Sequence, residues 1–71
     1  MNYEIRHNPE QHRFETKIDN LLSVIDYRLD GKNLTLPHVG VAKALEGRGI
    51  AGELTRTALD WARAENYHVI P

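Results

Sequence analysis

The segment with the clearest chemical potential is Gly47-Arg48-Gly49-Ile50-Ala51-Gly52, called here the helix-start segment. Its glycines let the backbone turn tightly and bring several N–H groups toward one point. Helical periodicity begins at the same place, so the segment would contain the unpaired first N–H donors of a helix and the positive end of its dipole. A helix start of this kind is a natural site for phosphate.

Arg48 strengthens the case for an anionic ligand. A cation at a helix start opposes the dipole, so stability alone would favour an acid there. A bound phosphate would remove that conflict and pair with the guanidinium. A flexible turn with an incidental arginine is the competing interpretation, because Gly-x-Gly alone is weak evidence. The segment lacks the Gly-Lys-Ser/Thr of a P-loop, and no acid follows on a later strand as in a dinucleotide fold.

Groups that could move a proton are few. Histidine suits proton transfer near neutral pH, which makes His38 the candidate general base. A lone histidine on a strand is more often a structural or surface residue, and that alternative stays open. Tyr27 is expected to pack, and Glu46 to act as a helix-start acid. The remaining histidines, at positions 7, 12 and 68, are dispersed and there is no cysteine, so no metal site is expected.

The elements that must position these residues follow from the hydrophobic pattern. Alternating and β-branched stretches predict four strands, over residues 3–7, 11–18, 21–29 and 34–41. Asp30-Gly31 predicts a hairpin between the last two. Pro37 and Gly40 are awkward inside a strand and predict an edge position, a bulge or a close backbone approach.

One amphipathic helix is expected after the helix-start segment. Ile50, Leu54, Ala58 and Trp61 fall on one stripe, and Asn66 fits the end of the helix. Residues 67–70 resume an extended pattern. The sequence therefore predicts an α+β fold, an antiparallel four-strand meander followed by one helix and a short fifth strand.

Length and composition limit the class of protein. The 71 residues allow one domain with a thin core, and the absence of cysteine leaves it without disulfide or zinc-thiolate staples. The net charge of -1 argues against a nucleic-acid partner, which would select a basic face. No apolar run approaches the roughly 20 residues of a membrane span, and the first residues do not form a secretory signal. A cytoplasmic protein without membrane contact is expected.

In this context the chain resembles the GNAT-type acyl-CoA N-acetyltransferases. These carry Arg/Gln-x-x-Gly-x-Gly/Ala at the start of the helix after their fourth strand; Gly49 and Ala51 match the last two positions, whereas Glu46 departs from the first. The small stand-alone predicted acetyltransferases of this superfamily are similar over a longer stretch, from about Leu22 to Pro71. The matching motifs, in order, are His38-Val39-Gly40-Val41, Gly47-Arg48-Gly49-Ile50-Ala51 and Ala58-Leu59-Asp60-Trp61-Ala62. Family members often carry an acid where this chain has Gly40.

The resemblance implies an N-acetyltransferase that moves an acetyl group from acetyl-CoA to a small-molecule or peptide amine. Residues 1–71 would form a single GNAT-like acyl-CoA-binding domain. The backbone near Val41 would polarise the thioester carbonyl. The pyrophosphate of coenzyme A would be held by the helix-start segment, that is by Gly47, Arg48, Gly49, Ile50, Ala51 and Gly52.

Two other functions stay open at this point. Family members continue past the position of Pro71 with a Cys-containing segment and a last helix, so a shortened chain would lack part of the acceptor site. The alternative is then an acyl-CoA-binding module with little or no turnover, or a small α+β interaction domain without a ligand. A C-terminal side left uncovered in this way would also favour self-association.

Overall fold

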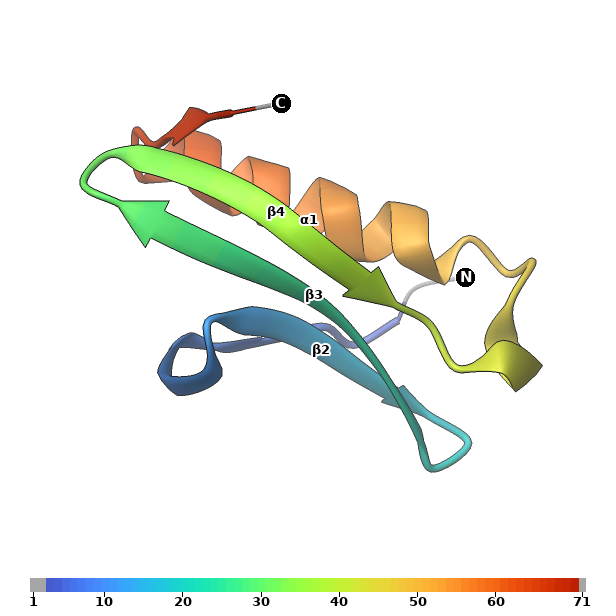
Figure 1. Ribbon diagram of the computed structural model, residues 1–71. Helices are drawn as coiled ribbons and strands as arrows, with labels where there is room; N and C mark the ends of the chain where they lie inside the picture. Colours follow the sequence, from blue (N-terminus) through green and yellow to red (C-terminus); the bar gives the residue numbers. More distant parts are fainter. Residues whose placement is uncertain (1–2, 71) are drawn as a thin grey trace.

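One sheet and one helix build the structure, a computed structural model that describes residues 3–70 (Figure 1). The strands lie in the order β1-β2-β3-β4-β5; β1 to β4 are antiparallel, and β5 is parallel to β4. The α+β prediction is confirmed. The elements are β1 (Arg6–Asn8), β2 (Arg13–Ile18), β3 (Leu21–Asp30), β4 (Asn33–Gly40), α1 (Ile50–Ala64) and β5 (His68–Val69), with short 3-10 turns η1 (Pro9–Gln11) and η2 (Lys43–Leu45).

The predicted bounds of the first two strands were wrong. β1 begins at Arg6 instead of residue 3, and β2 begins at Arg13 instead of residue 11. The connection between the two strands accounts for the later start of β2. The Asn8 side chain accepts a hydrogen bond from the backbone N–H of Gln11, and Pro9 starts a 3-10 turn. His12 closes the turn in the left-handed region with φ 53°, so residues 9–12 are unavailable to either strand.

A β-bulge lies where β4 carries its proline. Arg28 pairs with Thr35 and Asp26 pairs with His38, so Tyr27 of β3 stands opposite two residues of β4, Leu36 and Pro37. Proline has no N–H to give to a ladder, and a bulge is one of the few positions inside a sheet that tolerates it. The predicted irregularity is confirmed as a bulge.

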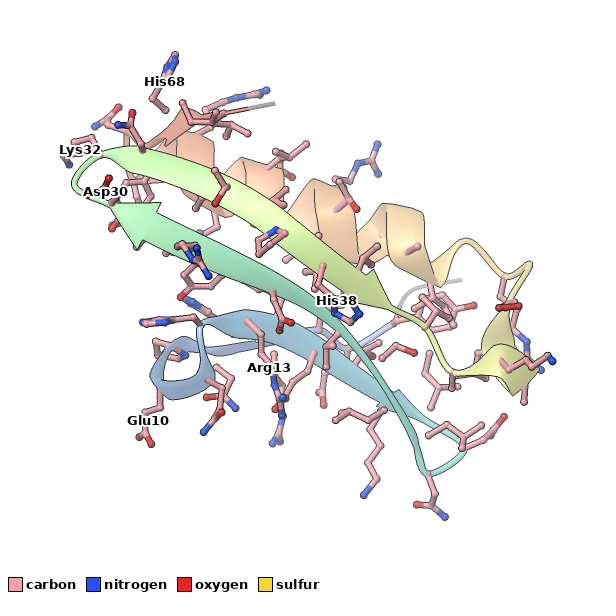
Figure 2. The ribbon with its side chains drawn as sticks, viewed as in Figure 1. Glu10, Arg13, Asp30, Lys32, His38 and His68 are labelled. Atoms are coloured by element: carbon pink, nitrogen blue, oxygen red, sulfur yellow. The ribbon has the colours of Figure 1, made fainter. Side chains whose placement is uncertain are left out.

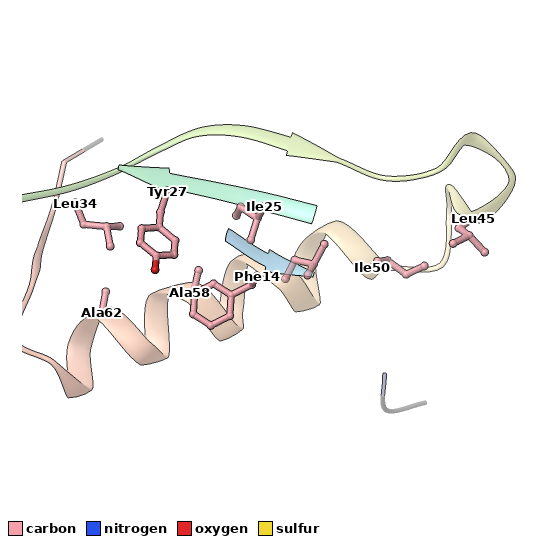
Figure 3. Close-up of a cluster of buried hydrophobic side chains, with 9 residues drawn as sticks. Phe14, Ile25, Tyr27, Leu34, Leu45, Ile50, Ala58 and Ala62 are labelled. Atoms are coloured by element: carbon pink, nitrogen blue, oxygen red, sulfur yellow. The ribbon is translucent and has the colours of Figure 1, made fainter. Parts of the chain in front are cut away.

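The core fills the space between the sheet and α1 (Figure 3). Alternate residues of β2 and β3 face the helix, and the stripe predicted for α1 faces the sheet. Trp61 is only half-buried and packs at the edge of this core. The buried apolar side chains are Phe14, Ile25, Tyr27, Leu34, Leu45, Ile50, Leu54, Ala58 and Ala62.

The end of α1 is shaped by Asn66, as the sequence predicts. Asn66 adopts a left-handed conformation with φ 62° directly after Glu65, the C-cap residue. Its N–H donates to the carbonyl of Arg63, and the N–H of Tyr67 donates to the carbonyl of Ala62 at 2.8 Å. These two bonds form a Schellman motif, which turns the chain back toward β4 and starts β5.

An aromatic cluster holds β1 against the rest of the fold. The His7 ring stacks on Phe14 with centroids 4.3 Å apart and meets Trp61 edge-on at 4.7 Å. His7 Nε2 lies 2.7 Å from the hydroxyl of Tyr27, which is buried as expected. Desolvation by burial lowers the pKa of His7 and raises that of Tyr27, the latter with a smaller contribution from Tyr67.

The lowered pKa of His7 predicts a loss of stability in mild acid. The unfolded chain takes up the proton near pH 6.5 and the folded chain only at lower pH, so the free energy of unfolding should fall as pH drops below about 6.5. Urea unfolding of the wild type and of His7→Gln between pH 8 and pH 5 measures this effect. The variant should show the shallower pH dependence, since the two proteins differ only at this residue. Equal slopes would contradict the assignment.

Candidate functional site

The start of α1 has the geometry that the sequence predicts. Gly49 is the N-cap residue, in the left-handed region at φ 77°, and offers no capping side chain. The first backbone bond of the helix runs from the N–H of Glu53 to the carbonyl of Gly49 at 3.1 Å. The N–H groups of Ile50, Ala51 and Gly52 therefore precede the helical ladder and lie at the positive end of its dipole.

Glycine is required at two positions of this segment by backbone conformation. Gly47 has φ 85° and Gly49 has φ 77°, a region that costs other residues about 1–2 kcal/mol. A Cβ atom at Gly47, Gly49 or Gly52 would meet no atom within 4 Å. The space in front of these glycines is open to a ligand.

A cavity of about 130 Å³ lies between the end of β4 and the start of α1. It gathers five of the predicted cofactor-binding residues; Arg48 and Gly52 lie outside its lining. The residues that line it are Val41, Leu45, Glu46, Gly47, Gly49, Ile50 and Ala51.

Two lining residues were not predicted as part of a binding site. Leu45 is 1% exposed and comes from η2, in a connection that the sequence left without structure. The only sign of its burial in the sequence is a large apolar residue in a stretch of small and charged residues. Glu46 follows directly and brings a carboxylate to the cavity, where the family motif has Arg or Gln.

Arg48 has a partner that the sequence did not indicate. Its Nη1 lies 3.8 Å from Oδ2 of Asp19, in the turn between β2 and β3. Both side chains are well exposed, at 50% and 72%, so the pair contributes little to stability. An anion at the helix start would compete with Asp19 for the guanidinium.

His38 lies outside this cavity, on the other side of the sheet. Ile25 and Tyr27 are buried beneath α1, so Asp26 between them points to the opposite face. His38 pairs with Asp26 in the ladder and shares that face, called here the outer face, which also carries Arg13 (Figure 2). His38 Nδ1 is 3.3 Å from Oδ2 of Asp26, and the side chains are 62% and 39% exposed.

Other sites are less suited to the predicted chemistry. A larger cavity of about 340 Å³ contains none of the predicted site residues, and its lining carries charges of both signs. The residues that line it are Glu4, Arg6, Glu15, Thr16, Lys17 and Leu22. Residues 3–70 contain no group of three His, Cys, Asp or Glu side chains able to hold a metal ion. Over the same residues no helix has the length and apolar character to cross a membrane.

Comparison with known proteins identifies the family. No curated protein matches the chain. The model of one family, described as GCN5-related N-acetyl-transferase, matches residues 13–71. This match spans β2 to β5 and includes the whole helix-start segment. The chain belongs to the GCN5-related N-acetyltransferase family.

Proposed function

We propose that the chain transfers an acetyl group from acetyl-CoA to an amine and holds the pyrophosphate of acetyl-CoA at the start of α1. The observation that carries this proposal is the cavity where Val41 of the chain after β4 meets Gly49, Ile50 and Ala51. Unpaired N–H donors and the helix dipole at this point favour an anion. Membership of an acetyltransferase family supports the same cofactor.

The residues present offer this ligand both favourable and opposing groups. The N–H groups of Ile50 and Ala51 precede the helical ladder, and Arg48 stands one residue before the N-cap. Glu46 brings a carboxylate to the cavity lining, and this carboxylate would repel phosphate. Glu46 is exposed, so its side chain has room to turn toward solvent when phosphate binds. Arg48 and the two N–H groups favour the anion, whereas Glu46, Asp19 beside Arg48 and Glu53 in the first turn of α1 oppose it.

The proposed reaction is a direct transfer. The amine nitrogen attacks the carbonyl carbon of the thioester, a C–N bond forms, and the C–S bond breaks. The attacking nitrogen releases a proton to a base, and the thiolate of coenzyme A takes up a proton. His38 is the proposed base, acting directly or through water, because it is an exposed histidine on the strand that leads to Val41.

An acyl-CoA-binding module with little turnover is the second candidate. The position of His38 favours it, since this side chain lies on the outer face and not in the cavity. Two measurements separate the candidates. Titration with acetyl-CoA should shift the backbone amide signals of residues 47–52, and unchanged signals would reject both functions. Release of free thiol with any member of a panel of amines would establish transfer; binding without thiol release would leave the module.

Replacement of Arg48 tests the electrostatic part of the site. Arg48→Ala should weaken acetyl-CoA binding about three- to tenfold, because an exposed charge-assisted contact contributes about 1 kcal/mol. Calorimetry measures the affinity. Arg56→Ala, which removes an exposed arginine of the same helix beyond its first turn, is the matched control and should bind as the wild type does. Equal losses in both variants would indicate a general effect of net charge.

A further inference from the structure

Asp26 and His38 form a cross-strand pair on the outer face. They stand directly opposite each other in the ladder between β3 and β4, and Oδ2 of Asp26 lies 3.3 Å from Nδ1 of His38. A carboxylate only accepts hydrogen bonds, and a neutral imidazole carries one N–H. A proton on Nδ1 of the neutral ring would face the carboxylate, and the lone pair would then lie on Nε2.

The bulge at Pro37 creates this pair. Continued without the bulge from the Arg28–Thr35 pair, the register would set Asp26 opposite Pro37 and His38 opposite Ile25. Ile25 is buried beneath α1, so His38 would then point toward the helix side of the sheet. The extra residue in β4 turns the imidazole to the outer face and sets it against Asp26.

Gly40 gives the ring its space. A Cβ atom at this position would come within 3.0 Å of Cε1 of His38, closer than almost all real contacts. Gly40 is not in the left-handed region, so its backbone does not require glycine. The missing side chain at residue 40 thus allows the imidazole to lie over the strand, with Nδ1 toward Asp26.

Arg13 does not compete with His38 for Asp26, because it pairs with Glu15. Arg13 stands opposite Asp26 on the other side of β3, in the ladder with β2. Its Nε donates to Oε2 of Glu15 at 2.8 Å. The contact between Asp26 and His38 is largely exposed, so it adds little to stability.

We propose that Asp26 is a positioning residue that holds His38 with Nε2 free to accept the proton of the attacking amine. The proposal rests on the proposed acetyl transfer. In the reaction Nε2 gains the proton that the amine loses, and Asp26 faces the imidazolium that results.

The tautomer of His38 tests the positioning. Nitrogen-15 spectra of the ring in the intact chain above pH 8 should show a protonated Nδ1 and an unprotonated Nε2. Asp26→Asn should lose this preference, since an amide both donates and accepts. Asp30→Asn, on the same strand and four residues along, is the matched control and should keep it. A protonated Nε2 in the wild type, or an unchanged tautomer in Asp26→Asn, would overturn the proposal.

Kinetics test the link to catalysis. Asp26→Asn should lower kcat about tenfold with the KM for acetyl-CoA unchanged, because the change affects proton transfer and not the helix start. Asp26→Glu should recover part of kcat. An unchanged kcat in Asp26→Asn would overturn the catalytic part. If Asp26→Asn does not fold, Gly40→Ala serves instead: it crowds the ring, and an unaltered His38 spectrum and kcat would overturn the proposal. If the wild-type protein releases no thiol, the transfer reaction is rejected. The nitrogen-15 spectra then test only whether Asp26 positions the His38 ring.

Discussion

Replacing Ala51 with glutamate should lower the affinity for acetyl-CoA about a hundredfold while the fold stays intact. Ala51 is exposed in the first turn of α1 and lines the cavity at the helix start. A carboxylate there would stand about 5 Å from a bound phosphate, and at an effective dielectric constant near 20 their repulsion is about 3 kcal/mol. That energy corresponds to roughly two powers of ten in Kd.

Stability should change in the opposite direction. An acid in the first turn of a helix interacts favourably with the dipole, by about 0.3–1 kcal/mol. Ala51→Glu therefore separates loss of the ligand from loss of the fold, which a change at Gly49 would not do. Calorimetry with acetyl-CoA and urea unfolding measure the two quantities.

The matched control for this substitution is Ala51→Gln, which adds almost the same volume without the charge. It should bind acetyl-CoA within a few-fold of the wild type. If the two variants lose affinity equally, bulk at the helix start and not its electrostatics governs binding. If Ala51→Glu binds as the wild type does and is folded, the pyrophosphate does not lie at the start of α1.

The order of elements could be predicted because its signals are local. The alternation along β3, the Asp30-Gly31 turn and the stripe of α1 each belong to one short stretch of sequence. The end of β1 and the start of β2 could not be predicted. They depend on how far the turn at Pro9 extends, and the Asn8 side chain and the left-handed His12 extend it to residue 12. The sequence predicts a turn at Pro9 but not the number of residues in it.

The candidate site also has a part that the sequence predicts and a part that it does not. Two glycines before a helix predict its open N–H groups, since a left-handed residue at the N-cap is a local feature. The pairs Arg48–Asp19 and His38–Asp26 join residues far apart in the chain. The second depends on a single extra residue at the Pro37 bulge, and a shift of one residue moves a side chain to the other face of a sheet. Pro37 predicted an irregularity, and only the ladder shows which residue it sets opposite Asp26.

The largest expected loss of stability comes from Leu54→Ala. Leu54 is fully buried between α1 and the sheet, at 0% exposure. Truncating a buried leucine to alanine costs about 2–5 kcal/mol, and a chain of this length has about 4–11 kcal/mol of stability in total. A large part of the variant should therefore be unfolded at 37 °C, and urea unfolding should show a midpoint far below that of the wild type.

The same substitution links the core to the candidate site. Leu54 lies one turn after Ile50, so the contact that it makes also holds the helix start beside Val41. Acetyl-CoA at a hundred times its Kd should restore about 2.7 kcal/mol to the variant, because it binds only the folded chain. Leu59→Ala, at a half-buried position of the same helix, is the control and should cost clearly less. Equal costs at the two positions would mean that α1 does not dock on the sheet through its Leu54 face.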